Sequence, residues 1–213
     1  EQTLIEHLGH EELSLLLMNK LNEDLGGRLS GAINIFKGNT SKLFLHQLVS
    51  SQLDMDRLDY LKRDSFFSGV SEGVIGSDRI IKMLSIKDNE LVVEAKGIYS
   101  IEKFLVARRL MYWQVYLHKT ALVAEKMLIN VLKRAKYLSM AGHTVPSPPF
   151  LDTFLKQRFN TEDFLNNPKI LDDFTMLDDN DIMNALKQWR NHPDRVLSRL
   201  STDLLDRHLL RIE

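Results

Sequence analysis

The chain has 213 residues, of which 44% are hydrophobic and 27% charged, the balance of one globular domain with or without a small appendage. Its 28 Lys and Arg offset 29 Asp and Glu, so we do not expect duplex nucleic acid as a partner. The longest apolar run near its start, residues 15–18, is far shorter than the roughly 20 residues of a membrane span, so we do not expect a membrane as a partner either. The absence of Cys excludes disulfides, thiolate metal ligands and a cysteine nucleophile, and agrees with a cytoplasmic location.

Apolar residues at three- and four-residue intervals predict helices in the first third of the chain. Between residues 10 and 25, leucines at 13, 17 and 21 share one face, and Gly26 with Gly27 ends the pattern. The same spacing predicts helices at residues 29–36, 42–49 and 55–67. Repeated glycines then favour a loop over residues 68–77.

The middle of the chain is expected to contain one hairpin and one long helix. Two segments rich in β-branched and other apolar residues, 83–86 and 91–95, flank a polar turn, which is typical of a β-hairpin. Ser100 can cap a helix, and no Gly or Pro follows before Gly142. We therefore expect a helix of roughly 35 to 40 residues that serves as a central spine.

The segment 142–149 contains three prolines, which remove amide donors, and we interpret it as a linker. Beyond it, short helical patterns cover residues 150–159, 179–189 and 201–210. The sequence thus predicts a mainly α fold, a helical bundle with a long central helix and one small β-hairpin. Its expected division is a partial catalytic domain at 1–141, the linker at 142–149 and a helical subdomain at 150–213.

One candidate site lies on the helix expected at 55–67. Asp56, Tyr60 and Asp64 recur at four-residue steps and share one face of that helix. A carboxylate there could bind a divalent cation, and Tyr60 and Asp64 could hydrogen-bond a sugar. The alternative is an exposed helix laced with ion pairs, of which Asp59 with Arg63 would be one.

A second candidate lies on the long helix, where Arg108, Tyr112, Tyr116 and Lys119 line one face. Residues 101–140 contain eight Lys or Arg against two Glu, a local excess of six positive charges. Such a field would attract a compact anion such as a nucleoside triphosphate, with arginine giving bidentate contacts and the aromatic rings suiting a base. A long solvated helix face is the alternative.

His10 begins the first expected helix, where it could act as a general acid or polarise a phosphate oxygen, although a single histidine at a helix start is more often structural. The sequence contains no His-Glu-x-x-His, Gly-x-Ser-x-Gly or Gly-x4-Gly-Lys motif. Zinc-protease, serine-hydrolase and P-loop chemistry are therefore not indicated.

Three motifs taken together resemble the HD-domain deoxynucleoside triphosphate triphosphohydrolases, the dGTPase-like family. They are Gly9-His10-Glu11, the stretch from Leu53 to Tyr60 with Arg63-Asp64, and Arg108 to Lys119. The resemblance covers residues 10 to about 136. It implies an HD-type helical fold, hydrolysis of a dNTP to deoxynucleoside and triphosphate, and a homo-oligomer. It also implies a divalent metal, whose identity among Mg, Mn, Fe, Ni and Zn stays open, as does activation by a dNTP.

The resemblance also implies roles for individual residues. Asp56 resembles the last metal ligand and His10 the catalytic histidine. The expected phosphate contacts are Arg57, Arg108 and Lys119, and the expected sugar contacts are Tyr60, Asp64 and Tyr116. Tyr116 would stack under the deoxyribose and disfavour a 2′-hydroxyl. Tyr112 occupies a position that is a histidine in some relatives.

In this family a His, a His-Asp dipeptide and a later Asp hold the metal, and Asp56 alone has a counterpart here. The sequence contains no His-Asp dipeptide. Because the family places that dipeptide upstream of the position of His10, we expect it before Glu1, and we interpret the chain as a fragment that is nearly inactive alone. Two alternatives remain open: another HD-type nucleotide phosphodiesterase or nucleotidase, and a non-catalytic helical module that binds nucleotides or partners.

Overall fold

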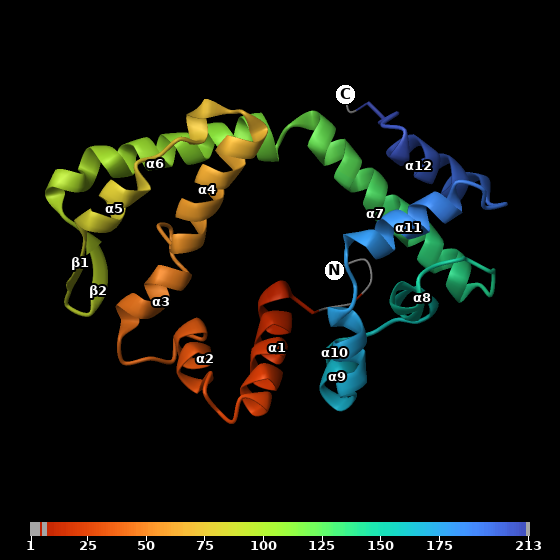
Figure 1. Ribbon diagram of the computed structural model, residues 1–213, viewed down its shortest axis with the longest axis horizontal. Coiled ribbons are helices and arrows are strands. Elements are labelled where there is room, and N and C mark those ends of the chain that lie inside the picture. The colour runs from red at the N-terminus through yellow and green to blue at the C-terminus, as the bar shows by residue number, and fades with distance from the viewer. Residues whose placement is uncertain (1–4, 6–7, 212–213) are drawn as a thin grey trace. The chain divides into compact units, whose positions relative to one another are not determined.

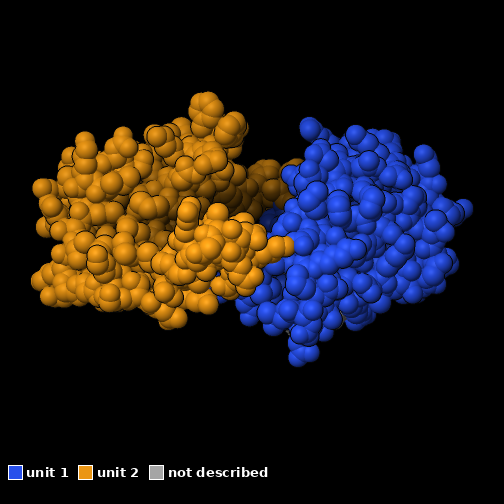
Figure 2. Space-filling model, turned by 60° about the horizontal axis from the view of Figure 1, so that its bottom comes forward, with its two compact units in different colours: residues 1–17, 122–213 blue, residues 18–121 orange. Residues whose placement is uncertain are grey.

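The computed structural model describes Ile5 and residues 8–211. Its contacts form two compact units, which Figure 2 shows in different colours. Unit 1 comprises residues 1–17 and 122–213, and unit 2 comprises residues 18–121. The expected linker at 142–149 has no regular structure up to Pro149 and lies inside unit 1. The domain division expected at that segment stays a prediction.

The chain is mainly α-helical, as the sequence predicts. The described residues form twelve α-helices, three short helical segments of other types and one two-stranded sheet (Figure 1). No helix among them is long and apolar enough to cross a membrane. The first helix, α1 (His10–Asp24), begins in unit 1 and ends in unit 2.

Unit 2 is built around the packing of two helices. Its helices are α2 (Ser30–Phe36), α3 (Leu43–Val49), α4 (Met55–Ser68), α5 (Ser77–Met83) and α6 (Ile98–Met111). Two 3-10 turns, η1 (Ser71–Gly73) and η2 (Ala95–Gly97), connect them. The buried core consists of Leu58, Leu61, Ile75, Ile80, Phe104, Ala107 and Met111. Because α4 supplies the first two and α6 the last three, these two helices are fixed against each other.

The hairpin of unit 2 is confirmed, with slightly shifted bounds. Strand β1 (Leu84–Lys87) pairs antiparallel with β2 (Glu90–Val93), and Leu84 lies opposite Val93. The two turn residues, Asp88 and Asn89, have φ of 50° and 67°, the left-handed conformation that two-residue hairpins require. The Asn89 side chain also donates to the Ser41 carbonyl, which ties the turn to the start of α3.

The single long helix expected from Ser100 is interrupted. A π-helical segment, η3 (Tyr112–Tyr116), follows α6, and the chain leaves helical geometry before α7 (Lys119–Met140) begins. The Leu117 amide bonds the Tyr112 carbonyl at 2.7 Å, five residues back. No Gly or Pro marks this break, so the sequence pattern did not reveal it.

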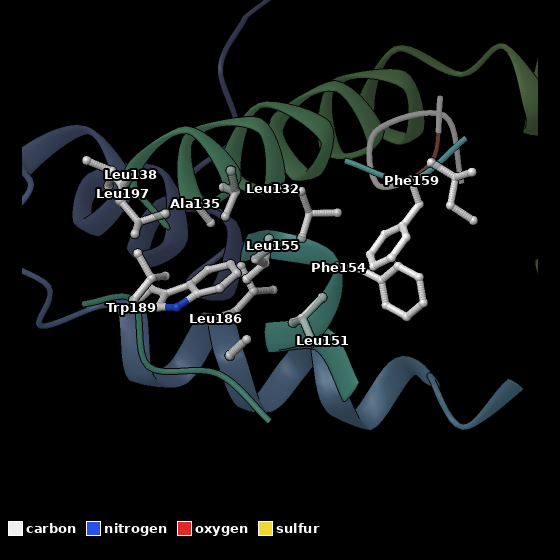
Figure 3. Close-up of a cluster of buried hydrophobic side chains, with 14 of the residues drawn as sticks. Leu132, Ala135, Leu138, Leu151, Phe154, Leu155, Phe159, Leu186, Trp189 and Leu197 are labelled. Atoms are coloured by element: carbon white, nitrogen blue, oxygen red, sulfur yellow. The ribbon is translucent and has the colours of Figure 1, made fainter. Parts of the chain in front are cut away.

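Unit 1 is held together by the second half of α7 and the helices that follow it. These are α8 (Pro149–Lys156), α9 (Thr161–Asn166), α10 (Pro168–Thr175), α11 (Asp179–Trp189) and α12 (Arg195–Leu205). Figure 3 shows side chains of α7, α8, α11 and α12 in this core. Among them is Trp189, which is fully buried and donates from its indole nitrogen to the Pro146 carbonyl at 2.7 Å. That bond fixes the Pro-rich segment to the core of unit 1.

Candidate functional site

The start of α4 holds the first part of the site. Asp54 is buried and caps the helix by accepting from the Arg57 amide at 2.8 Å. Its other carboxylate oxygen accepts from Arg57 Nε at 2.9 Å. This hydrogen bond raises the pKa of the Arg57 guanidinium, whose side chain stays 26% exposed. Arg57 is thus fixed at its Nε and still reaches solvent.

Farther along α4, Tyr60 and Asp64 meet Tyr116 from η3. The Tyr116 hydroxyl donates to Asp64 Oδ2 at 2.6 Å. The Tyr60 and Tyr116 rings pack edge to face, with centroids 5.9 Å apart and planes at 80°. All three side chains are partly buried. The structure therefore brings together the three residues that the resemblance assigns to the sugar.

Tyr112 and Arg108 extend this cluster along α6 and η3. The Tyr112 ring lies 5.2 Å from that of Tyr116, again edge to face. The Arg108 guanidinium lies 5.8 Å from the Tyr112 ring centroid and donates to Gln52 Oε1 at 2.9 Å. A cation and two aromatic rings from one segment thus face the α4 residues of the same unit.

The two guanidinium groups act electrostatically on the same phenol. Burial raises the pKa of Tyr60, and the neighbouring Tyr112 raises it further, while the charges of Arg108 and Arg57 oppose that rise. Burial also raises the pKa of Tyr116 well above 10, as do the hydrogen bond to Asp64 and its charge. Tyr60 and Tyr116 therefore carry their protons at neutral pH, and Tyr116 is a donor there.

Three expected site residues do not join this cluster through any described contact. Asp56 is exposed in the first turn of α4. Lys119 is exposed and begins α7, so the interruption at the end of η3 removes the continuous face that it was expected to share with Tyr116. His10 begins α1 in unit 1, whereas the cluster lies in unit 2. Their roles stay predictions.

The described residues do not form a metal site by themselves. Ile5 and residues 8–211 contain no group of three or more His, Asp or Glu that could hold a metal ion. Asp56 is the single expected ligand among them.

An open hollow of about 650 Å³ in unit 2 is lined by residues of α4 and the segment after it, among them Asp59, Phe66 and Ile75. None of the nine expected site residues lines it.

Sequence reasoning missed Asp54 and Gln52, which hold the two arginines. Asp54 directly precedes the helix pattern and stands three residues before Arg57, the spacing of a helix cap, so a signal for it was present. Gln52 contacts Arg108 from 56 residues away in the sequence, and no local pattern predicts such a contact. The expected ion pair of Asp59 with Arg63 is present and exposed.

Part of the chain matches a known protein family. Residues 75–142 match the family described as the HD associated region. The chain is 32% identical to the uncharacterized protein YwfO of Bacillus subtilis over 166 residues, which is 77% of this chain and 36% of that protein. It is 24% identical to the deoxynucleoside triphosphate triphosphohydrolase SAMHD1 homolog of Dictyostelium discoideum over 138 residues, 59% of this chain and 27% of that protein.

A solved structure extends the similarity to the whole chain. The crystal structure of a phosphohydrolase from Bacteroides thetaiotaomicron matches with a TM-score of 0.97 and 57% sequence identity, over 100% of this chain and 53% of that one. The chain is related to the HD phosphohydrolases. The chain spans about half of the solved Bacteroides chain, and its match covers 36% of the Bacillus protein.

Proposed function

We propose that the intact protein hydrolyses a deoxynucleoside triphosphate to a deoxynucleoside and triphosphate, and that unit 2 carries the binding surface for the substrate. The observation that carries this proposal is the contact of Tyr116 with Asp64, flanked by Arg57 and Arg108. A carboxylate and aromatic rings suit a sugar, and guanidinium groups suit phosphates. Support for the substrate class comes from the similarity to the Dictyostelium relative, which is named a deoxynucleoside triphosphate triphosphohydrolase SAMHD1 homolog.

Different residues of the cluster would contact the sugar and the phosphates of a nucleotide. Asp64 has a second carboxylate oxygen besides the one that Tyr116 occupies, and that oxygen can accept from a sugar hydroxyl. By the family resemblance, the Tyr116 ring would stack under the deoxyribose and disfavour a ribose 2′-hydroxyl. Arg57 and Arg108 would bind the phosphates through their remaining N–H groups, because each already uses one donor on the protein. Lys119 would add a third cation.

His10 and Asp56 complete the proposal. The resemblance assigns His10 to proton transfer or to polarising a phosphate oxygen, and Asp56 to a divalent cation that would supply Lewis-acid chemistry. The described residues provide one carboxylate of such a site and do not fit a metal alone. The part of the reaction derived from this chain is therefore substrate binding and orientation.

Product analysis tests the proposal directly. The full-length product of the gene that encodes this chain is incubated with each dNTP, each NTP and Mn²⁺, and the products are separated by ion-exchange chromatography. We expect triphosphate and deoxynucleoside from dNTPs. Asp64→Asn should lower kcat/KM by about tenfold or more, because a sugar contact is lost. The matched control Tyr99→Phe, which changes an exposed hydroxyl on α6, should not.

Two results would replace the proposal by its alternatives. Release of orthophosphate or pyrophosphate instead of triphosphate would indicate an HD-type nucleotidase or phosphodiesterase with another substrate. Nucleotide binding with no turnover by the full-length protein, whichever metal is added, would indicate a non-catalytic binding module.

A further inference from the structure

Two residues of one short segment hold the two arginines of the cluster in unit 2. Gln52 and Asp54 both precede α4, and the Ser51 hydroxyl accepts from the amide of the residue between them at 3.2 Å. Asp54 binds Arg57 of α4, and Gln52 binds Arg108 of α6. The same segment therefore places both guanidinium groups, although these belong to different helices.

The two arginines are held in chemically different ways. The Asp54 carboxylate lies 2.9 Å from Arg57 Nε, so each charge of this ion pair offsets the other. Gln52 instead offers a neutral amide oxygen to Arg108 Nη1, also at 2.9 Å. Within Ile5 and residues 8–211, Arg108 forms no ion pair. Its positive charge is therefore oriented by the protein but not compensated.

The Tyr60 phenol reflects this difference. The charges of both arginines lower the pKa of Tyr60, and Arg108 does so more than Arg57. The charge of Asp54 raises the pKa of Tyr60 and so works against Arg57. The positive field at this cluster therefore comes mainly from Arg108.

Each arginine also keeps a different set of donors for an anion. Arg57 uses Nε and keeps its two terminal nitrogens, whereas Arg108 uses Nη1 and keeps Nε and Nη2. Among the described residues, neither remaining set has a hydrogen-bond partner. Two neighbouring N–H groups of a guanidinium suit two oxygens of one phosphate. Arg108 thus combines a bidentate donor set with an uncompensated charge.

We propose that Gln52 is a positioning residue that orients Arg108 without cancelling its charge, which makes Arg108 the main receptor for a phosphate group in unit 2. The inference rests on the proposed function for the identity of this anion. A glutamate at the same position could still accept from Arg108, and more strongly, but it would neutralise the guanidinium. The neutrality of the amide is therefore the property that matters at Gln52.

Isothermal titration calorimetry of the full 213-residue chain with inorganic triphosphate tests this role at neutral pH. Inorganic triphosphate is the probe because it carries the phosphates without a sugar or a base. Gln52→Ala, which loosens Arg108, should raise the dissociation constant by about threefold. Gln52→Glu should raise it by about tenfold or more, because the charge of the receptor is cancelled. The matched control Gln157→Glu, an exposed site in unit 1, should bind triphosphate like the wild type.

The order of the two variants separates this role from a merely structural one. If Gln52 only tied its segment to α6, glutamate would preserve the bond, and Gln52→Glu would bind triphosphate better than Gln52→Ala. We expect the opposite order in binding, while urea unfolding should find Gln52→Glu at least as stable as Gln52→Ala. Added salt should also weaken triphosphate binding less in Gln52→Glu than in the wild type, because one net charge is lost.

Two results of the calorimetry would overturn the proposal. They are a wild type that does not bind triphosphate, and a Gln52→Glu variant that binds it as tightly as Gln52→Ala or more tightly. The analysis of dNTP products tests the proposed function separately. Release of triphosphate from dNTPs with a wild-type kcat/KM in full-length Gln52→Glu would refute the role of Gln52 alone. The expected binding order without any dNTP hydrolysis would support the role of Gln52 at an anion site and refute the proposed activity.

Discussion

The hydrogen bond between Tyr116 and Asp64 joins η3 to α4 and should stabilise unit 2 measurably. Its length is 2.6 Å, its acceptor is a carboxylate, and both side chains are partly buried. Hydrogen bonds to charged groups contribute about 1.5–3 kcal/mol, and partial exposure favours the lower end of that range. We therefore expect Tyr116→Phe to lower the free energy of unfolding by about 1.5 kcal/mol, because the rest of the ring keeps its packing.

A double-mutant cycle separates this bond from other effects of the substitutions. Tyr116→Phe, Asp64→Asn and the double variant are unfolded in urea and followed by circular dichroism. The coupling energy should be about 1 kcal/mol or more, as expected for residues in direct contact. Tyr99→Phe, the exposed control, should change the free energy of unfolding by less than about 0.5 kcal/mol. A coupling energy of zero would refute the bond and the cluster built on it.

The raised pKa of Tyr116 makes the same bond sensitive to alkaline pH. A group whose folded pKa lies above its unfolded value stabilises the fold below the unfolded pKa, here 10, and that stability is lost as the pH rises toward the folded value. The wild type should therefore lose stability more steeply above pH 10 than Tyr116→Phe does. Urea unfolding at pH 9, 10 and 11 measures the two slopes, and equal slopes would contradict the assigned pKa shift.

Three further substitutions test other parts of the chain. Asp194 caps α12 and pairs with Arg134, which holds the pKa of Asp194 at about 2. Asp194→Asn keeps the cap, and it should lower the free energy of unfolding in urea at pH 7 by about 1–2 kcal/mol after allowance for solvent screening. This difference from the wild type should vanish as the pH falls from 3.8 through 2. Gly73→Ala would place a Cβ 2.8 Å from a methionine sulfur and a serine Cβ, so it should cost about 1–3 kcal/mol in thermal unfolding, whereas Gly31→Ala, with no atom nearby, should not destabilise. Asp54→Asn keeps the cap of α4 but removes the charge that fixes the neighbouring arginine, so it should raise KM for a dNTP by about fivefold with little change in kcat.

Much of the fold could be predicted because its helices are amphipathic over several turns. The first helix was expected at 10–25 and spans His10–Asp24, and the helix expected at 179–189 is α11 without a shift. The sequence pattern did not predict short helices that lie between helix-breaking residues. Helix α5 follows three glycines, and α9 and α10 have only six and eight residues. Helix α12 begins six residues before the expected start, because its cap, Asp194, precedes the apolar pattern.

The sequence predicted the site unevenly, for a physical reason. Tyr60 and Asp64 are one turn apart on α4, so their shared side follows from helical spacing alone. Their meeting with Tyr116 depends on how α6 packs against α4, which apolar spacing indicates only loosely, and the family resemblance supplied that link. Gln52 belongs to no pattern at all, since it lies before the cap of α4 and meets Arg108 through tertiary structure.

The π-helical turn alters the regular spacing on which the prediction of this cluster depended. In an α-helix, residues four apart advance by about 40° around the axis, so Arg108, Tyr112 and Tyr116 would drift progressively across the face. The five-residue hydrogen bond from Leu117 to Tyr112 widens the turn and changes the direction in which the later residues point. Single π-helical turns inside α-helices are rare and occur frequently at functional sites. The sequence contains neither Gly nor Pro there to force the irregularity. We therefore expect the contacts of Tyr116 with Asp64 and Tyr60 to hold this turn, so that removing them should allow η3 to relax toward a regular helix.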